Sequence, residues 1–425
     1  MLAPGLGIGI DVGTSKVALA LVDGTGAQVH TASQPHDAVI AGPSGHFAQD
    51  PAKILACAES LVRNLPADLR NRVAGIGFTG QMHGVVLHDA QGHPLSPLIT
   101  WQDRRTLEDP GFLASLGPNI HAGFGCATLA WMARHGGIPK GARAATIHGF
   151  LAARWGGMER SRIDPTDAHA WGGLVPRPGV DPAILPETVD HGARIGALVA
   201  DIGLPLGIPL AAPLGDNQAS MRATLTDPDR ELAFTLGTGC QLSAVIAKGS
   251  CTPTPGCEVR PFDADREALV AAPLAGGAAW LWLADTAMSW ATDLGLAPPS
   301  RDVVLAKLDE LGLAAADRLD FTPQLAGERH DPTLTGVLRG LAFANGRLGE
   351  VARALARGLA SVPKSMLPRA AFAGRTRVIA SGNALRRSRL LKAMAEAEFA
   401  LPVVLTDCTE EAATGAARVA KELIP

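Results

Sequence analysis

The chain has 425 residues, of which 47% are hydrophobic and 19% charged, a balance typical of a globular protein rather than a disordered one. This length is enough for two or three domains, each with its own core. The formal net charge of -3 and the aromatic content of 4% argue against nucleic-acid binding, which needs a basic face or stacking aromatic side chains. We therefore expect no nucleic-acid partner.

The cysteines and the apolar stretches indicate the cellular compartment of the protein. The six cysteines are scattered, without a Cys-x-x-Cys pair, so the sequence predicts neither a disulfide framework nor a zinc site. The N-terminus lacks an apolar stretch of signal-peptide length, and we expect a cytoplasmic protein. One uncharged apolar stretch, 268–284, contains Pro273 and two glycines and is shorter than the roughly 20 residues of a membrane span. It predicts a buried strand, a glycine turn and the start of a core helix, so we expect no membrane association.

The N-terminal segment predicts a strand hairpin. Residues 6–11 read as a buried strand, Gly13-Thr14-Ser15 as a tight turn, and 17–22 as the returning strand. A strong turn signal at 23–26 precedes a third strand at 27–33. The hairpin therefore opens a small antiparallel meander.

The middle of the chain alternates between helical and strand patterns. Residues 51–64 predict a helix, and the β-run 73–78 leads into Gly80-Gln81-Met82-His83-Gly84. A further apolar run, 210–214, ends just before Asp216. The sequence therefore predicts that Asp216 lies at the end of a strand.

The hairpin pattern returns in the second half of the chain. Residues 232–236 predict a strand, Gly237-Thr238-Gly239 a turn, and 241–246 the strand back. The helix at 348–360 should stop near Pro363, because proline removes a helix hydrogen bond. The remaining predicted elements are a strand at 377–380, a helix at 386–397, a strand at 403–405 and a final helix at 410–423.

A hairpin followed by alternating strands and helices thus occurs twice, which predicts two α/β domains of related design. The short polar segment 226–230 contains a proline and is the expected boundary. We expect an N-terminal domain over 1–227, with the first hairpin, and a C-terminal domain over 228–425, with the second. The assembly state is left open, with a homodimer as one alternative.

Each glycine turn has the composition of a phosphate site. Glycines let the backbone approach phosphate oxygens, and a tight turn points successive N–H groups into one concavity. The hydroxyls of Thr14, Ser15 and Thr238 add donors, and Asp11 offers a carboxylate for Mg²⁺ through water. Taken alone, either turn is better explained as a plain hairpin. Their occurrence at equivalent places in two domains favours a shared role in phosphate binding.

Two other phosphate-binding designs are excluded. No Gly-x-x-x-x-Gly-Lys-Ser/Thr motif is present, and the glycines after the first strand lead into a second strand, not a helix. A clamp of two hairpins that face each other across an interdomain cleft remains. This is the arrangement of the two-domain α/β, actin-like (ribonuclease-H-like) ATPase fold.

Several motifs follow one another along the chain: Asp11-Val12-Gly13-Thr14-Ser15, Gly80-Gln81-Met82-His83-Gly84, Trp101-Gln102-Asp103-Arg104-Arg105, Gly215-Asp216-Asn217-Gln218-Ala219-Ser220, Leu236-Gly237-Thr238-Gly239, Ala275-Gly276-Gly277-Ala278, Ser381-Gly382-Asn383 and 411–417. In this order they resemble the motifs of the FGGY carbohydrate kinases, and the resemblance covers essentially the whole chain. Within that family, Gly123-Phe124-Gly125-Cys126-Ala127-Thr128 and Thr146-Ile147-His148 resemble the sedoheptulokinase subgroup.

The resemblance implies an ATP- and Mg²⁺-dependent kinase that phosphorylates a primary hydroxyl of a ketose, with sedoheptulose as the leading substrate. Asp216 matches the catalytic base, which also contacts the sugar, and Asp11 matches the aspartate near Mg²⁺. Gly13, Thr14, Ser15, Gly237, Thr238 and Gly239 match phosphate contacts, Gly382 and Asn383 the adenosine side, and Gln81, Met82, His83, Trp101 and Asp103 the sugar pocket.

Some assignments have structural alternatives. Asp216 suits a helix N-cap, Asp103 an ion pair with Arg104 or Arg105, His83 a turn and Trp101 a core position. Gly149 stands where the family often has an aspartate, and the register of 164–168 against a sugar-side motif is uncertain. The functional alternatives are a family kinase for xylulose, ribulose or a polyol, and a catalytically silent protein that responds to ATP or sugar.

Overall fold

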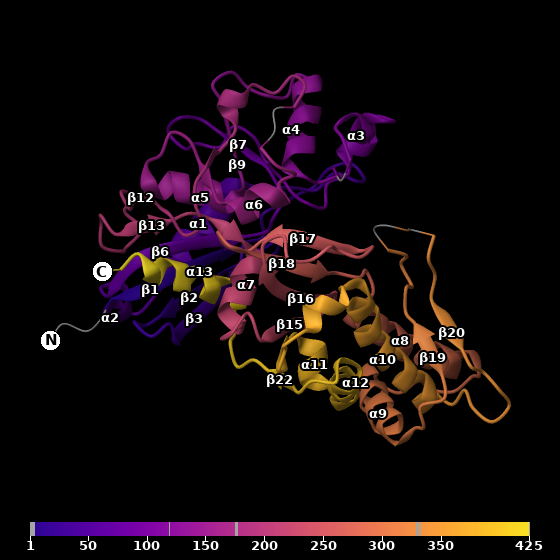
Figure 1. Ribbon diagram of the computed structural model, residues 1–425. Coiled ribbons are helices and arrows are strands. Elements are labelled where there is room, and N and C mark those ends of the chain that lie inside the picture. The colour runs from indigo at the N-terminus through magenta and orange to yellow at the C-terminus, as the bar shows by residue number, and fades with distance from the viewer. Residues whose placement is uncertain (1–4, 119, 175–176, 329–330, 332, 425) are drawn as a thin grey trace. The chain divides into compact units, whose positions relative to one another are not determined.

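The structure is a computed structural model that describes residues 5–118, 120–174, 177–328, 331 and 333–424 (Figure 1). The chain divides into two compact units, one of Met1–Thr224 with Cys408–Pro425 and one of Leu225–Asp407. The boundary after Thr224 falls close to the expected boundary after residue 227. The boundary after Asp407 was not expected, because the sequence predicts that 408–425 belongs to the C-terminal domain, whereas this segment belongs to the first unit.

The first unit is built on a sheet with the strand order β12-β13-β6-β1-β2-β3, and β14 also pairs with β6. Strand β1 is antiparallel to β2 and parallel to β6, while β2 is antiparallel to β3. The strands are β1 (Leu6–Val12), β2 (Lys16–Val22), β3 (Gln28–Pro35), β6 (Val73–Gly80), β12 (Arg194–Ala197), β13 (Pro209–Ala211) and β14 (Leu214–Gly215). The predicted hairpin and third strand are confirmed.

The second unit repeats this topology in a sheet of order β17-β18-β16-β15-β21-β22. Its strands are β15 (Glu231–Leu236), β16 (Cys240–Ala247), β17 (Cys257–Pro261), β18 (Arg266–Ala271), β21 (Arg377–Ser381) and β22 (Val403–Leu405). Strand β15 is antiparallel to β16 and parallel to β21. In the same way, β1 is antiparallel to β2 and parallel to β6. The turns at 13–15 and 237–239 are therefore equivalent, as the sequence predicts.

The remaining elements surround these sheets. In the first unit they are α1 (Pro51–Arg63), α2 (Ala67–Arg70), α3 (Phe112–Ser115), α4 (Gly125–Arg134), α5 (Ile147–Gly156), α6 (Pro165–Ala170), α7 (Asp216–Thr224), α13 (Glu411–Glu422) and the short strands β4 (Val39–Ile40), β5 (Ala48–Gln49), β7 (Val86–His88), β8 (Leu98–Ile99), β9 (Arg143–Ala145), β10 (Arg162–Ile163) and β11 (Glu187–Thr188). In the second unit they are α8 (Gly277–Asp293), α9 (Arg301–Ala314), α10 (Leu348–Met366), α11 (Asn383–Arg387), α12 (Arg389–Phe399), β19 (Asp320–Thr322) and β20 (Val337–Arg339).

Strand alternation gives the first sheet two different faces. Ile8 and Ile10 of β1 belong to a core that includes Ile54 of α1 and Phe150 of α5. The opposite face of β1 presents glycines to helix α13, which lies across the first sheet in Figure 1. Successive strand residues point to opposite sides, so the isoleucines of β1 lie on the core face and the glycines between them lie on the face toward α13.

The glycines allow helix α13 to touch the sheet backbone. A Cβ atom at Gly9 would lie 1.9 Å from the carbonyl oxygen of Ala413, and one at Gly77 would lie 2.0 Å from that of Ala416. Because no side chain fits at either position, the sheet accepts only a closely packed small-residue helix there. This packing explains why the C-terminal segment belongs to the first unit and not to the second.

Helix α10 runs one turn beyond the stop predicted near Pro363 and ends at Met366. Proline cannot donate the hydrogen bond to the carbonyl group of Leu359, four residues earlier. The Cys240 thiol contacts that carbonyl oxygen at 3.7 Å. The thiol replaces part of the missing helix bond, and the buried face of α10 continues past the proline.

The helix predicted at 386–397 is divided at Ser388 into α11 and α12. Ser388 has φ -117° and ψ 114°, outside the helical region, and its side chain accepts the N–H of Leu391. Ser388 is therefore the N-cap of α12. Periodicity spans such a cap without a signal, which is why a single helix was predicted.

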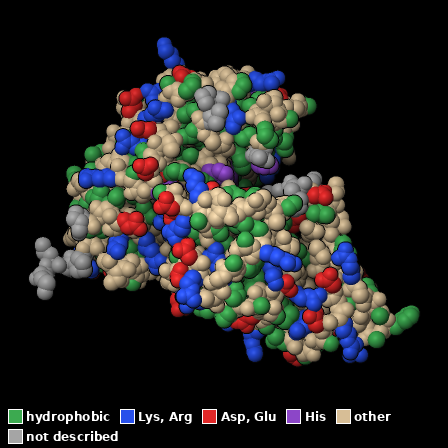
Figure 2. All heavy atoms as spheres, viewed as in Figure 1, with side chains coloured by type: hydrophobic (Ala, Val, Ile, Leu, Met, Phe, Trp, Pro, Cys, Tyr) green, Lys and Arg blue, Asp and Glu red, His purple; other side chains and the backbone are tan. Residues whose placement is uncertain are grey.

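The apolar stretch 268–284 has the structure that was predicted, since β18 ends at Ala271 and α8 begins at Gly277. In the described part of the chain, no helix has the length and apolarity needed to cross a membrane. Positive and negative side chains are interspersed over the face of the molecule in Figure 2.

Candidate active site

The first unit brings Asp11 and Asp216 to the same edge of its sheet. Strand β6 pairs with β1 on one side and with β14 on the other, all in parallel. Asp11 lies opposite Thr79 near the end of β1, and Asp216 directly follows Gly215, which lies opposite Gly80. Because parallel strands end at one edge, the two carboxylates flank the end of β6. Asp216 is the first residue of α7.

The electrostatics of Asp11 reflect this concentration of acidic groups. Burial, with the charges of Asp216 and Glu410, raises the pKa of Asp11 to about 7 against the opposing effects of His148 and Lys16. Lys16 itself contacts Glu410 at 2.5 Å. The carboxyl group of Asp11 is therefore poised between its two protonation states near neutral pH, and a bound cation would favour the ionised form.

A buried ion pair lies beside these carboxylates. His148 of α5 contacts Asp167 of α6 through Nε2 and Oδ2 at 2.6 Å, and both side chains are fully buried. Burial lowers the pKa of His148, but the charges of Asp167, Asp216 and Asp11 raise it by more, so the net shift is upward. The neighbouring carboxylates therefore favour the cationic form of this histidine.

The Nδ1 atom of His148 lies over the end of strand β6. A Cβ atom at Gly80 would be 3.0 Å from it. Among the described residues, neither this nitrogen nor Oδ1 of Asp167 has a hydrogen-bond partner, although both are buried. His148 was quoted only as part of the Thr146-Ile147-His148 motif, so sequence reasoning missed its position. A histidine followed at some distance by an Asp-x-x-Asp segment was the available signal.

The segment 164–168, whose register was uncertain, has three separate contacts. Asp164 caps α6 by accepting the N–H groups of Thr166 and Asp167 at 2.8 and 3.2 Å. The Thr166 hydroxyl accepts the N–H of Gly215 at 2.9 Å, and Asp167 holds His148. The segment thus fixes the residue that precedes Asp216.

Gly149, the departure from the family pattern, lies against the N-cap of α5. A Cβ atom there would lie 2.9 Å from Oγ1 of Thr146, and its next neighbour would be the carbonyl oxygen of Arg162 at 3.7 Å. Thr146 is the N-cap of α5. A longer residue at 149 would therefore disturb this helix cap.

We expect the buried pair to matter for stability. Replacing His148 by leucine leaves the Asp167 carboxylate buried without its cation, which should lower the free energy of unfolding by about 3 kcal/mol in urea denaturation. Replacing both residues by leucine should recover part of this loss. The exposed pair of His93 with Asp89 is the matched control, and His93→Leu should have little effect. If His148→Leu lowered the free energy of unfolding no more than His93→Leu does, the ion pair of His148 with Asp167 would not stabilise the fold.

Two residues of the expected sugar pocket, Met82 and His83, lie near this edge. The Met82 sulfur is adjacent to Gly215, where a Cβ atom would be 2.7 Å from it. His83 has a positive φ of 75° and stacks on Phe124 at 4.7 Å between ring centroids. Its Nδ1 contacts the carbonyl oxygen of Ala170, so that nitrogen carries the hydrogen and the neutral ring has Nε2 as its acceptor.

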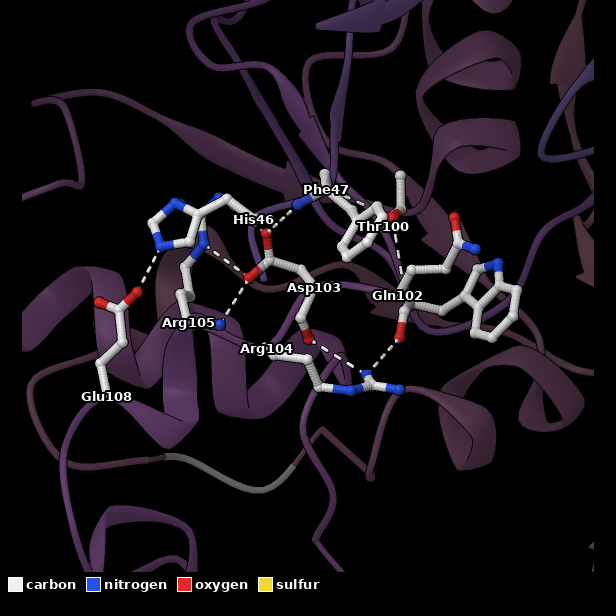
Figure 3. A network of polar contacts seen from close by, with 9 residues as sticks. His46, Phe47, Thr100, Gln102, Asp103, Arg104, Arg105 and Glu108 are labelled. Atoms are coloured by element: carbon white, nitrogen blue, oxygen red, sulfur yellow. Dashed lines mark hydrogen bonds and ion pairs between the residues drawn. The ribbon is translucent and has the colours of Figure 1, made fainter. Parts of the chain in front are cut away.

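Asp103 lies in a network of hydrogen bonds and an ion pair, which Figure 3 shows. Arg105 donates to both of its carboxylate oxygens at 2.8 and 2.9 Å, and the N–H of Phe47 donates to Oδ2 at 2.8 Å. Burial raises the pKa of Asp103, but these hydrogen bonds and the charge of Arg105 lower it by more. The side chain is 1% exposed. This geometry favours the ion-pair alternative over a sugar contact.

Trp101 and Gln81 contact the first hairpin turn. The Trp101 indole N–H donates to the Thr14 hydroxyl at 3.1 Å, and 41% of the residue is exposed. The Gln81 amide donates to the side chain of Gln49 at 2.9 Å and to the carbonyl oxygen of Gly13 at 3.4 Å. The exposed indole is thus not a core residue, and the expected sugar and phosphate residues of this unit are joined by hydrogen bonds.

The expected nucleotide residues of the second unit also lie together. The N–H groups of Gly277 and Ala278 at the start of α8 donate to the carbonyl oxygens of Gly237 and Thr238 at 2.9 and 3.0 Å. Gly382 has a φ of 99°, and a Cβ atom there would be 2.3 Å from the carbonyl oxygen of Leu236. Only glycine fits this position, and Asn383 begins α11 beside it.

Known proteins share both the sequence and the fold of this chain. A model of the N-terminal domain of the FGGY family of carbohydrate kinases matches residues 6–135. The chain is 31% identical to sedoheptulokinase from Homo sapiens, over 99% of this chain and 98% of that protein. It is 30% identical to sedoheptulokinase from Mus musculus, over 97% and 96%. A crystal structure of xylulose kinase from Rhodospirillum rubrum has a TM-score of 0.81 at 23% identity, over 99% of this chain and 91% of that one.

Two α/β units of common topology, each with a glycine turn after its first strand, define the actin-like ATPase fold. The chain belongs to the FGGY family of carbohydrate kinases. It is a carbohydrate kinase, and membership of a kinase family implies ATP as the phosphoryl donor. These findings confirm the resemblance, the fold class and the enzyme class that the sequence predicts.

Proposed function

We propose that this kinase transfers the γ-phosphoryl group of ATP to a primary hydroxyl of a ketose, with sedoheptulose as the substrate and sedoheptulose 7-phosphate as the product. The observation that carries the proposal is the similarity to two sedoheptulokinases along nearly the whole chain. The Asp11–Asp216 pair at the sheet edge supplies chemistry that such a transfer requires.

Asp216 is the proposed base. As the sugar oxygen bonds to the γ-phosphorus, its proton moves to the Asp216 carboxylate, and the bond between the γ-phosphorus and the bridging oxygen of ADP breaks. Phosphoryl transfer has a loose transition state, so positioning and charge neutralisation contribute most of the rate. The Thr166 bond to Gly215 fixes the backbone next to Asp216 and so contributes to this positioning.

Asp11 is the proposed magnesium-side residue. Hard carboxylate oxygens suit Mg²⁺, which keeps several of its own waters, so Asp11 would hold the ion through water. The upward shift in its pKa shows a carboxylate that a cation would stabilise. Bound Mg²⁺ supplies charge neutralisation to the phosphates. Among the described residues, no group of three His, Cys, Asp or Glu side chains is arranged to bind a metal directly.

The other roles follow the same assignment. Gly13, Thr14 and Ser15 in one unit, and Gly237, Thr238 and Gly239 in the other, are proposed phosphate contacts. Gly382 and Asn383 are assigned to the adenosine, while Met82, His83 and the exposed ring of Trp101 are assigned to the sugar. Gln81 and Asp103 are proposed to support this site through the hydrogen bonds described above.

A sugar panel tests the substrate. The purified chain with ATP and Mg²⁺ is assayed for ADP release with sedoheptulose, xylulose, ribulose and glycerol at matched concentrations. We expect sedoheptulose to give the highest kcat/KM, and mass spectrometry of the product to place the phosphate on carbon 7. Faster turnover of another sugar would contradict the substrate assignment and leave the enzyme class in place.

A further inference from the structure

The turn between β1 and β2 presents two backbone donors that the protein itself does not use. Within the described residues, the N–H groups of Thr14 and Ser15 have no hydrogen-bond acceptor, while the N–H of Gly13 closes the hairpin onto the carbonyl oxygen of Lys16 at 3.0 Å. Unpaired donors at a tight turn suit an anionic ligand.

The carbonyl groups of the same turn are hydrogen-bonded by buried side chains. The Gln49 amide donates to the carbonyl oxygen of Thr14 at 2.6 Å. The carbonyl oxygen of Gly13 accepts from the Gln81 amide at 3.4 Å and contacts Nε2 of His36 at 3.3 Å. The exposed fractions of Gln49, Gln81 and His36 are 3%, 4% and 6%.

The orientation of the two amides follows from hydrogen-bond chemistry. A carbonyl oxygen only accepts, so the Gln49 nitrogen faces Thr14 and its Oε1 faces away. That Oε1 accepts from the Gln81 nitrogen at 2.9 Å. The two glutamines therefore form one directed chain, which ends on the backbone of the turn.

Holding these carbonyl groups determines where the free donors point. In a planar trans peptide, the C=O of one residue and the N–H of the next point in opposite directions. The bond from Gln49 to the Thr14 oxygen turns the Ser15 N–H away from the protein. The bonds to the Gly13 oxygen do the same for the Thr14 N–H. The glutamine pair thus orients both donors of the turn toward solvent.

We infer that Gln49 and Gln81 are positioning residues that preorganise the first hairpin turn to bind a phosphate group of ATP. This inference rests on the proposed function, because it takes the turn as a phosphate site. Gln49 acts through the Thr14 peptide and does not contact the nucleotide. Trp101 adds a hydrogen bond to the Thr14 hydroxyl and so links the same turn to the exposed indole.

Nucleotide binding to Gln49 variants tests the inference. Gln49→Met keeps the length of the side chain and removes its donor. By calorimetry with MgATP, we expect the Kd of this variant to rise about tenfold, whereas its Kd for adenosine, which has no phosphate, stays at the wild-type value. Gln49→Glu places a carboxylate against the Thr14 oxygen and should weaken ATP binding further.

Gln28→Met is the matched control. Gln28 donates to the carbonyl oxygen of Thr409 at 2.6 Å, so it makes the same kind of bond in the same unit, away from the turn. We expect this variant to bind ATP as the wild type does, with all variants measured below their melting temperatures.

Three results would overturn the inference: unchanged ATP affinity in Gln49→Met, an equal loss in Gln28→Met, or wild-type protein that binds ATP no more tightly than adenosine. Turnover of sedoheptulose is measured in parallel. If the wild type binds ATP and does not phosphorylate sedoheptulose, the proposed substrate fails, and the binding series still decides the role of Gln49.

Discussion

Replacing Asp216 by asparagine should lower kcat with sedoheptulose about 10³-fold, while the affinity for ATP stays close to that of the wild type. Asparagine preserves the size and hydrogen-bonding geometry of the side chain but cannot accept the proton of the sugar hydroxyl. Steady-state kinetics with ADP detection measure the first quantity and calorimetry with MgATP measures the second. The split between them assigns Asp216 to the chemical step.

The same substitution separates the proposed base from the helix-cap alternative. Asparagine and aspartate are nearly equal N-caps, so a residue that only caps α7 would tolerate the change. Asp50 caps α1 by accepting the N–H groups of Ala52 and Lys53, and Asp50→Asn is the matched control. Wild-type turnover in Asp216→Asn would remove this residue as the base.

Asp11→Asn should have two opposite effects, a loss of about 10² in kcat and a gain in stability above neutral pH. In the folded chain, burial raises the pKa of Asp11 from 3.8 to about 7. Between these values the unfolded state releases the proton and the folded state keeps it, so stability falls as pH rises and stays low above pH 7. The difference corresponds to at most about 4 kcal/mol, and because the side chain is only half-buried, we expect about 1–2 kcal/mol.

Urea denaturation in the presence of a chelator measures this gain, because bound Mg²⁺ would stabilise the ionised carboxylate. The difference between wild type and Asp11→Asn should be largest near pH 8 and shrink as the pH falls toward 5. Asp23 is the control, since hydrogen bonds from Thr25 lower its pKa, and Asp23→Asn should give no gain at high pH. Equal stability of wild type and Asp11→Asn at pH 8 would contradict the conclusion that the ionised Asp11 carboxylate destabilises the folded state.

Much of the fold was accessible from local pattern. The hairpin of β1 and β2, its counterpart of β15 and β16, and strand β22 were all predicted, since alternating apolar runs and glycine turns are local signals. Two helices differ from the prediction, one for a tertiary reason and one for a local reason. Helix α10 continues past Pro363 because a cysteine of strand β16 contacts the freed carbonyl group. The local cap at Ser388 interrupts a helical period that looked continuous.

The candidate site was accessible in part. Asp11 was proposed for Mg²⁺ from its place at a strand end, and Asp216 was assigned as the base from the family resemblance. The structure brings these two strand ends to either side of β6. Asp103 and Gln81 were assigned to sugar from the family pattern, whereas their side chains hold other parts of the protein. The functional roles of all four residues stay predictions until the variants are measured.

Local sequence patterns were enough to identify the family, the strand hairpins and the acidic residues that follow the strands, because these depend on residues adjacent in the chain. The side-chain partners in the site, in contrast, come only from the tertiary structure. His148 pairs with Asp167, Gln49 reaches the Thr14 carbonyl group, and Glu410 contacts Lys16. Such pairings depend on how helices and strands distant in sequence pack against one another, and on the need of each buried polar group for a partner. No local period encodes that requirement.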